Sequence, residues 1–521
     1  MVQSSSADIT EKTSLLEAAE RRLTEELSAV RASLNDLKPV SQLPTEVLEE
    51  IFGICVSWLF GHQKPKYRFA WTQVCRRWRR ISLNSARLWQ YIDICDSRLA
   101  HEFLVRSGTA PISIVSASPL KLCSENLESH AERLQSIDVY LFPDDMVDLF
   151  TSIGHNLSNL QSLSLKVPPV SGNFILDIHT PLTRVSSLAL DCVAIPWHTV
   201  RDLMRLSLRG LGSGYSPSLS QLYTIFESSP RLEFIRIESV DITDHDIPPT
   251  MVSLPYLRDL TLSAKAPTIL SILSQLSFPH TTRLHINCHT FDSLRSILPI
   301  DHFRNYTSNS EIGTIRLARC ALRFLRSEAT PWTIEPSDTQ ISLGSSSSKL
   351  PTSLLPDIQS LFELSRVTAL ELSQDILSEI PSNVLVSFLA QATNLEHLRV
   401  AYNDLAALLD VLSSPQPSTE PHEVSLTNTM PCPRLRTILF TRPGDIWWNF
   451  KEQWVPPLLA LAKARHASEV PLEVLEFRQC HGISLQRISD LFSGLVGGVC
   501  VAENVSVGAA AVRRAVPTFM F

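Results

Sequence analysis

His285, Cys288 and His289 lie close together in the sequence and are residue types that bind metals. Imidazole and thiolate groups are preferred zinc ligands, so these side chains first suggest a metal site. However, they follow one another along a single predicted strand and its turn, and no second ligand pair accompanies them. A position in the turn of a structural repeat explains Cys288 better, and we expect no metal.

A glycine-rich loop, Gly210-Leu-Gly212-Ser-Gly214, follows the apolar run from Leu203 to Leu208 and suggests phosphate binding. It lacks the GK[ST] ending of a phosphate loop and the glycine spacing of a dinucleotide site, so a loop between repeats is favoured. The sequence contains no GxSxG elbow, HExxH motif or EF-hand loop. A triad assembled from distant residues would leave no such motif. We expect a protein that is not an enzyme and has no cofactor.

Four arginines, Arg76, Arg77, Arg79 and Arg80, form a basic cluster that could serve nuclear import or nucleic-acid binding. The chain as a whole has a formal net charge of -7 and an isoelectric point near 6.1, so its overall field does not attract phosphate backbones. A solvated helix face explains the cluster better. Nucleic acid is therefore not the expected partner.

The basic cluster belongs to a predicted helical module that runs from Leu43 to Trp89. Leu48, Ile51 and Phe52 fall on one face of its first helix, and Phe69–Leu83 reads as a second helix. The module has more aromatic bulk than its own core needs, so part of that surface should meet a partner. Its tryptophans are Trp58, Trp71, Trp78 and Trp89.

From Leu134 onward the sequence repeats a short Leu-x-x-Leu-x-Leu unit, which predicts short strands. The early spacing of about 25 to 28 residues is the period of leucine-rich repeats, and helix-like stretches such as Leu219–Phe226 lie between the copies. Strands of an ordinary α/β sheet do not usually repeat one template at a near-constant period. The copies are Leu134–Val139, Leu160–Leu165, Val185–Leu190, Leu232–Ile237, Leu257–Leu262, Leu284–Ile286, Ile315–Leu317, Val367–Leu372, Leu395–Val400, Leu435–Phe440 and Leu472–Phe477. The turn residues typical of such repeats are Cys192, Cys288, Cys320, Asn403 and Cys480.

Two segments rich in Pro and Ser, near residues 330–356 and 413–433, interrupt the repeats, and we expect exposed loops there. After Leu491 the pattern stops. We therefore divide the chain into an N-terminal helix at 1–38, the helical module at 39–97, a solenoid at 98–490 and an atypical tail at 491–521.

The N-terminal helix carries an apolar stripe with a seven-residue step. The stripe consists of Ile9, Leu16, Leu23, Leu27, Val30, Leu34 and Leu37. It predicts a short coiled coil that could join two copies of the chain through residues 9–37, although Thr13 and Glu20 occupy seam positions. A single amphipathic helix lying on the next domain fits the pattern equally well.

The chain has 521 residues, of which 44% are hydrophobic and 19% charged, so it can bury a large core. Its length favours several domains or a repeat array. The 10 cysteines are scattered without a CxxC pair, which is typical of reduced, buried thiols. Met1–Lys12 lacks the apolar core of a secretory signal, and Leu491–Val512 is too polar to span a bilayer. We expect a protein of the cytoplasm or nucleus that does not enter a membrane.

The order of residues in Leu43–Phe52, Val74–Arg79 and Leu88–Trp89 resembles the F-box motif. The whole chain is similar to fungal F-box proteins of the basidiomycete type, which place a short coiled coil before the box and irregular leucine-rich repeats after it. In that family the box binds a Skp-type adaptor, which links it to a cullin ubiquitin ligase, and the repeats hold a substrate. The segment from Cys55 to Phe69 departs from the family because it is longer and more aromatic. The resemblance implies adaptor contacts by Leu43, Pro44, Leu48, Ile51, Phe52, Val74, Cys75, Trp78 and Trp89.

The expected fold is thus an N-terminal helix or coiled coil, a small helical F-box and an irregular leucine-rich-repeat horseshoe, an α/β solenoid. Two functions stay open. The chain is either the substrate-recognition subunit of a Skp/cullin/F-box ubiquitin ligase or a ligase-independent scaffold that self-associates through its heptads. We favour the first because the box carries nearly every apolar anchor of its family. Expected contacts of the strand face with a protein substrate are Arg236, Glu238, Arg258, Asp259, Thr261, Arg316, Glu371, His397 and Arg399.

Overall fold

The structure, a computed structural model, divides into two compact units. The first is built from Met1–Ser171 and Ile178–Arg184, and the second from Gly172–Asp177 and the chain from Val185 onward. The residues that the structure describes are 2–61, 70–116, 127–153, 157–178, 182–242, 251–289, 291–299, 304, 306, 312–318, 321–326, 339–345, 353–373, 380–401, 406–414, 430–441, 448–449, 452–478, 480–481 and 485–502. Within them the protein is a mixed α/β protein with long parallel sheets, consistent with a repeat solenoid.

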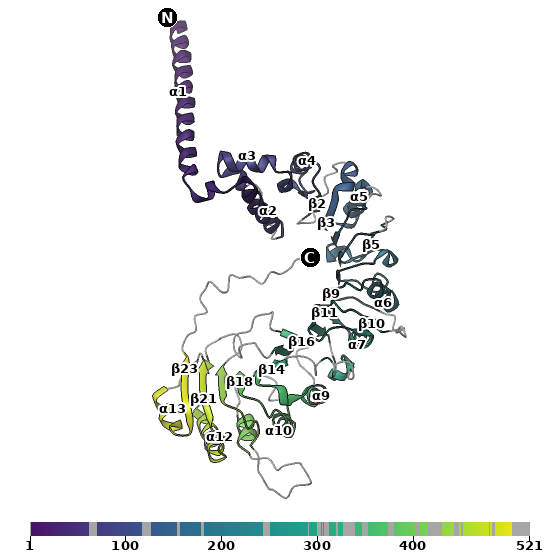
Figure 1. Cartoon of the computed structure of the whole chain (residues 1–521), viewed down its shortest axis with the longest axis vertical. Helices are drawn as coiled ribbons and strands as arrows, with labels where there is room; N and C mark the ends of the chain where they lie inside the picture. The colour runs from purple at the N-terminus through teal and green to yellow at the C-terminus, as the bar shows by residue number, and fades with distance from the viewer. Residues whose placement is uncertain are drawn as a thin grey trace. The chain divides into compact units, whose positions relative to one another are not determined.

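Helix α1 (Val2–Asp36) opens the first unit and extends away from the helices that follow it (Figure 1). It ends before Pro39, whose ring cannot continue a helix. From Leu16 to Leu37 the residues of the predicted stripe are exposed, from 50% at Leu27 to 77% at Leu37. Within the described part of the chain, therefore, nothing covers the stripe.

Two helices, α2 (Thr45–Gly61) and α3 (Arg76–Asn84), form the centre of the helical module. The predicted helix from Phe69 to Leu83 is wrong in extent, because extended backbone at Cys75 separates α3 from the residues before it. The Cys75 sulfur accepts a hydrogen bond from the Trp78 amide at 3.4 Å and so caps α3. The module's 3₁₀ helices are η1 (Pro39–Gln42), η3 (Ala70–Gln73) and η4 (Ala86–Trp89).

A parallel sheet completes the first unit and begins two residues after Trp89. The helical module therefore runs directly into the sheet. The strands are β1 (Tyr91–Asp93), β2 (Ile112–Val115), β3 (Leu134–Tyr140) and β4 (Ser162–Lys166). The connecting helices are α4 (Ser97–Arg106), η5 (Glu128–Arg133), α5 (Pro143–Ile153) and η6 (Pro169–Ser171).

The second unit begins with parallel strands in regular register. They are β6 (Ser187–Asp191), β8 (Arg205–Arg209), β9 (Phe234–Glu238), β11 (Asp259–Ala264) and β13 (Arg283–Cys288). Helices α6 (Leu219–Glu227) and α7 (Ala266–Ser274) lie on one side of these strands (Figure 1). Shorter elements of this part are β5 (Phe174–Ile175), β7 (Val193–Ala194), η7 (Trp197–Thr199), β10 (Val252–Ser253), β12 (Leu276–Ser277) and η8 (Leu294–Ser296).

A hairpin interrupts the parallel order after β13. The strand that pairs in parallel with β13 is β16 (Thr339–Ser345), whereas β15 (Ala321–Arg326) runs antiparallel between β16 and β14 (Ile312–Ala318). Parallel order resumes where β14 meets β17 (Ala369–Ser373). The loop predicted near residues 330–356 is therefore wrong at β16 and at α9 (Leu354–Leu361).

The last part of the second unit again has parallel strands, β17, β18 (His397–Ala401), β19 (Thr437–Thr441), β21 (Leu472–Arg478) and β23 (Val496–Ala502). The prediction that the repeat pattern ends at Leu491 is wrong, because β23 pairs with β21 along its length. A Cβ added at Gly497 would lie 2.8 Å from the Glu473 carbonyl oxygen, so glycine permits this close approach. The remaining elements are η10 (Leu364–Arg366), α10 (Ser382–Gln391), α11 (Ala406–Ser413), β20 (Trp448–Asn449), η11 (Glu452–Trp454), α12 (Val455–Ala467), β22 (Cys480–His481) and α13 (Leu485–Phe492).

Every predicted copy of the repeat falls on a strand, so the strand positions are confirmed. The loop predicted near 413–433 is wrong at its end, where Met430, Pro431 and Cys432 are buried. Of the predicted turn residues, Cys192 and Cys288 are buried, whereas Cys320 and Asn403 lie outside the described residues. None of the described helices combines the length and apolar composition needed to cross a bilayer.

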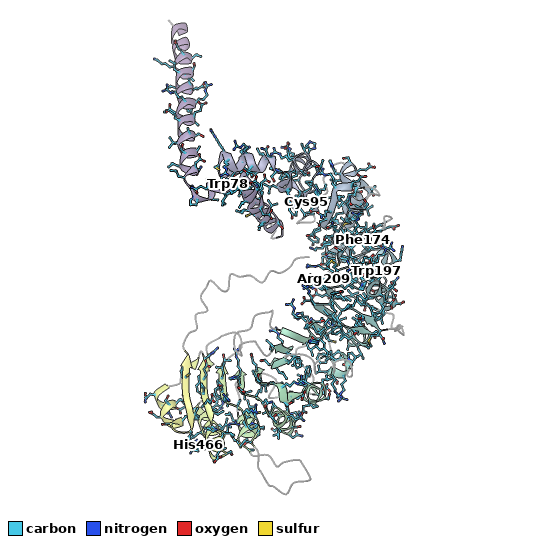
Figure 2. The ribbon with its side chains drawn as sticks, viewed as in Figure 1. Trp78, Cys95, Phe174, Trp197, Arg209 and His466 are labelled. Carbon is cyan, nitrogen blue, oxygen red and sulfur yellow. The ribbon has the colours of Figure 1, made fainter. Side chains whose placement is uncertain are left out.

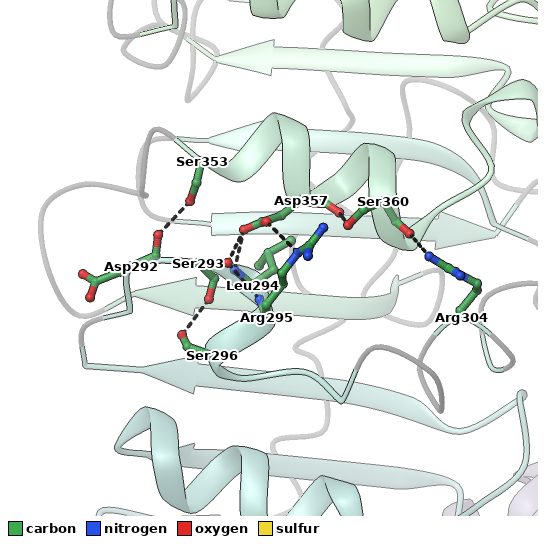
Figure 3. A network of polar contacts seen from close by, with 9 residues as sticks. All are labelled: Asp292, Ser293, Leu294, Arg295, Ser296, Arg304, Ser353, Asp357 and Ser360. Carbon is green, nitrogen blue, oxygen red and sulfur yellow. Dashed lines mark hydrogen bonds and ion pairs between the residues drawn. The ribbon is translucent and has the colours of Figure 1, made fainter.

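The carboxylate of Asp357 joins the two chain segments that flank the inserted hairpin (Figure 3). It accepts hydrogen bonds from the Ser293 hydroxyl at 2.6 Å and the Leu294 amide at 2.8 Å, and it pairs with Arg295 at 3.5 Å. Beside it, the Ser353 hydroxyl donates to the Asp292 carbonyl at 2.7 Å. Because Asp357 is only 6% exposed, η8 and α9 are tied together by a buried, charged acceptor.

We predict that Asp357→Ala lowers the free energy of unfolding by about 2 to 3 kcal/mol, since it leaves the buried Leu294 amide and the part-buried Ser293 hydroxyl without their acceptor. Chemical denaturation of the whole chain measures the change. The matched control is Asp410→Ala, because Asp410 is an exposed carboxylate on α11. Equal destabilisation by the two variants would contradict the role given to Asp357.

Candidate functional site

The core of the helical module is the inner face of α2. Leu48, Phe52 and Val56 are at most 2% exposed, and they recur at the four-residue step of one helix face. The Phe52 ring lies 4.7 Å from the Trp78 ring of α3, tilted by 55°. This ring contact holds the two helices against each other.

The outer face of α2 carries a second apolar stripe, Val47, Ile51 and Ile54, which are 43%, 40% and 63% exposed. The stripe continues one turn at a time along the helix, so these side chains share a face. Before α2, Val40 is 38% exposed, Leu43 is half-buried and Pro44 is exposed. We call Val40, Leu43, Pro44, Val47, Ile51 and Ile54 the outer stripe. An apolar surface of this kind is typical of a protein-binding site.

Arg77 of α3 fixes the backbone from which the outer stripe begins. Its guanidinium donates hydrogen bonds to the carbonyl oxygens of Ser41 and Leu43, the second at 2.6 Å. The planar guanidinium can hold two carbonyls at once in a fixed orientation. Arg77 thus positions the Leu43–Pro44 segment, a role that the sequence pattern did not reveal.

Trp89 links the helical module to α4 of the first unit. Its indole nitrogen donates to the Ser82 carbonyl at 2.8 Å, and its ring meets Phe103 edge-on at 5.0 Å. The Arg106 guanidinium lies 4.7 Å from the Trp89 ring centre, within the range of a cation–π contact. These contacts attach η4 to α4, so the module is held firmly on the rest of its unit.

The predicted adaptor contacts fall into three groups by their exposure. Leu48, Phe52 and Trp89 are buried in the module, whereas Pro44, Ile51 and Val74 are exposed. Leu43, Cys75 and Trp78 are half-buried. The prediction did not include the exposed residues Val40, Val47 and Ile54, although the spacing of Val47, Ile51 and Ile54 indicates a shared helix face. In the segment Cys55–Phe69, residues 62–69 lie outside the described part.

A second candidate surface is the strand face of the second unit. On β9, β11 and β13 the leucine and isoleucine positions are buried, and the residues between them are at least partly exposed, except at the end of a strand. The register aligns Arg236 with Thr261, and Thr261 with His285. We use the name strand face for the side of this sheet formed by these alternate residues. Arg209 lies there, on the side of the strands away from α6 (Figure 2).

Charged side chains on the strand face form ion pairs, and the carboxylates are less exposed than most of the arginines. Arg209 lies 3.9 Å from Asp191 and 4.0 Å from Glu238, and Arg236 lies 3.7 Å from Glu238. The Arg209 and Arg236 side chains are 63% and 46% exposed, against 29% for Asp191 and 30% for Glu238. Guanidinium groups therefore form the outermost layer here, and their planar donors suit carboxylate partners.

The pKa of His285 depends on the charged residues that lie near it on the strand face. Burial lowers the pKa of its imidazole, and the neighbouring Arg283, Arg236 and Arg323 lower it further, while Asp259 opposes them. Asp259 forms an ion pair of 2.7 Å with Arg283. Arginines from three strands thus surround one imidazole, which places them together on this face.

The remaining predicted substrate contacts are either more buried than Arg209 and Arg236 or lie outside the aligned positions of the strand face. Glu371 and Arg399 are in register, 3.7 Å apart, and their side chains are only 13% and 14% exposed. The backbone of Arg316 is in register with Glu371, but its side chain lies outside the described part. Arg258 precedes β11 and pairs with Glu233 at 3.6 Å. His397 is half-buried, and burial lowers its pKa.

The metal-site interpretation of His285, Cys288 and His289 gains no support from their positions. Cys288 is buried, and His289 is exposed. Within the described residues, no group of three or more His, Cys, Asp or Glu side chains is arranged to hold a metal ion.

A comparison with protein families matches residues 40–95 to the F-box-like family. No curated protein matches the chain. The matched range begins in η1 and ends just after β1, so it contains α2, α3 and Trp89. Residues 40–95 of this chain therefore form an F-box-like domain.

Proposed function

We propose that the chain is the substrate-recognition subunit of a ubiquitin ligase of the Skp/cullin/F-box type. The F-box-like match implies a Skp-type adaptor as the first partner. The observation that carries the proposal furthest is the two-sided nature of α2, whose inner face is buried and whose outer stripe is free for a groove.

In this proposal the predicted anchors have two roles. Pro44, Ile51 and Val74 contact the adaptor directly, together with Leu43 and the rest of the outer stripe. Leu48, Phe52 and Trp89 act indirectly, because they hold α2 and α3 in the orientation that presents the stripe. The adaptor then joins the chain to a cullin, and the chain itself has no catalytic part.

The strand face is the proposed substrate surface, formed by irregular leucine-rich repeats. Parallel strands in register present their alternate side chains as rows, which is the geometry solenoid proteins use for extended binding surfaces. In the ion pairs around Glu238, the side chains of Arg209 and Arg236 are more exposed than the carboxylate that they contact. We therefore place the first contacts of a protein substrate there.

We predict that Val47→Asp with Ile51→Asp lowers recovery of a Skp-type adaptor at least about tenfold in co-purification, because each buried aliphatic side chain contributes about 2 kcal/mol. The double variant Leu43→Ala with Pro44→Ala should also lower it sharply. Both changes lie on the surface or at its edge, so the thermal unfolding midpoint should stay near that of the parent chain.

The control for this experiment is Val105→Asp, because Val105 is an exposed aliphatic residue on α4, 64% exposed. It should leave adaptor recovery unchanged. Undiminished recovery with the outer-stripe variants would contradict the docking assignment. Absence of adaptor from the parent chain would favour a ligase-independent scaffold.

For Arg77 we expect Arg77→Leu to weaken adaptor affinity about fivefold to tenfold, since two hydrogen bonds to the Leu43–Pro44 segment are lost. Arg77→Lys should recover part of the affinity. Titration calorimetry with purified adaptor measures both. Arg80→Leu, an exposed arginine on the same helix, is the control, and an equal loss in that variant would assign the effect to charge alone.

Charge reversal tests the strand face. We predict that Arg209→Glu with Arg236→Glu abolishes recovery of substrate proteins while adaptor recovery is unchanged, as measured by quantitative mass spectrometry of adaptor complexes. Arg366→Glu in η10, 49% exposed, is the control. If the same proteins are recovered from the double variant and the parent chain, the strand face is not the substrate surface.

A further inference from the structure

The apolar stripe of α1 is the largest set of exposed hydrophobic residues on a single described element. Leu16, Leu23, Leu27, Val30 and Leu34 are between 50% and 72% exposed. The helix has 35 residues and is therefore about 52 Å long. Exposed apolar surface of this extent needs a partner, and the described residues of the chain do not supply one.

The spacing along α1 defines the geometry of that partner. Leu23 to Leu27 and Val30 to Leu34 are steps of four, and Leu27 to Val30 is a step of three, which is the alternation of a coiled-coil seam. Leu16, Leu23 and Val30 then occupy the d positions, and Thr13, Glu20, Leu27 and Leu34 occupy the a positions. The partner is therefore a second helix with a matching seam.

Charges beside the seam identify the second helix. In this heptad frame Lys12 and Glu26 fall on g positions, and Glu17 and Arg31 on e positions. In a parallel pair a g residue meets the e residue five positions later on the other helix. Lys12 would meet Glu17 of a second copy and Glu26 would meet its Arg31, so both flanks of a pair of identical helices are complementary.

We propose that α1 pairs with α1 of a second copy of this chain, parallel and in register, as a two-stranded coiled coil. An antiparallel pair that kept Leu23 against Leu27 would bring Glu17 near Arg31 of the second copy. It would also place Glu26 against Glu26, where like charges repel, so the parallel pair has more attractive contacts beside the seam. Glu20 is the one charged seam residue from Thr13 to Leu34, and in the parallel pair it faces its own equivalent. Glu20 thus weakens the pair and keeps it reversible.

This inference is independent of the proposed function, because α1 lies outside the F-box-like domain. Its consequence is a bivalent assembly with two F-box-like domains and two strand faces. A partner that offers two binding segments would then be held by avidity, without any new contact.

Sedimentation velocity of the full chain tests the pairing. We expect the parent chain to sediment as a dimer, and Leu16→Asp with Leu23→Asp to sediment as a monomer. Leu15→Asp is a matched control, since Leu15 is 64% exposed but lies off the seam, and it should remain dimeric. Glu20→Leu should lower the dissociation constant at least about tenfold, because two leucines replace two charges in the seam.

Orientation is tested by Leu16→Cys under mild oxidation. A parallel, in-register pair brings the two substituted positions together, so a disulfide should join position 16 of the two copies, and peptide mapping identifies it. The parent chain under the same conditions controls for its own cysteines. A monomeric parent chain, a monomeric Leu15→Asp variant, or capture of a different protein by the stripe would overturn the proposal. A dimer without this disulfide would overturn the parallel register.

Discussion

The alternation of side chains along short parallel strands is the constraint on which the second unit depends. Leu206, Ile235, Leu260 and Leu284 are in register and at most 2% exposed, so each strand is anchored by its apolar positions. Because successive residues point to opposite faces, the same register aligns Arg236, Thr261 and His285 on the other face. The polar rows therefore follow from apolar packing, and a one-residue shift would bury the charges.

In helix α2, too, a buried apolar face determines which residues are exposed, but the spacing is that of a helix. The side chains of Leu48, Phe52 and Val56 bury one face, and that packing leaves Val47, Ile51 and Ile54 exposed on another. The Phe52–Trp78 contact and the two Arg77 hydrogen bonds then set the orientation of the helix and of the segment before it. In both units the packing of a buried apolar face determines which residues are exposed on another face.

Much of this architecture could be predicted from the sequence, because apolar periodicity is a local signal. The strand copies and α6 were found in this way. The hairpin of β14 and β15 was not, since nothing in the pattern of Ile315–Leu317 indicates that β16 intervenes next to β13. β23 was missed because Gly497 and Gly498 weaken the strand signal, although Gly497 is what permits the close approach to Glu473. β16 was missed because it lies in a segment rich in Pro and Ser, a composition that indicates a loop.

The candidate site, too, could be predicted only in part from the sequence. Motif order identified the region from Leu43 to Trp89, and the family match at residues 40–95 agrees with it. Motif order cannot separate an anchor that packs inside, such as Phe52, from one that faces solvent, such as Ile51, because that depends on the rotation of α2 against α3. Arg77 was taken as part of a solvated basic face, since its two carbonyl acceptors lie 34 and 36 residues away in the chain.

The central claim is that the outer stripe of α2, and not its inner face, meets a Skp-type adaptor. Hydrogen–deuterium exchange of the full chain with and without purified adaptor tests this claim most directly. We predict slower exchange in the peptides that cover residues 40–54 and 74–80 when the adaptor is present, with the strand face unchanged. Unchanged exchange in residues 40–54 on a complex that has formed would contradict the account.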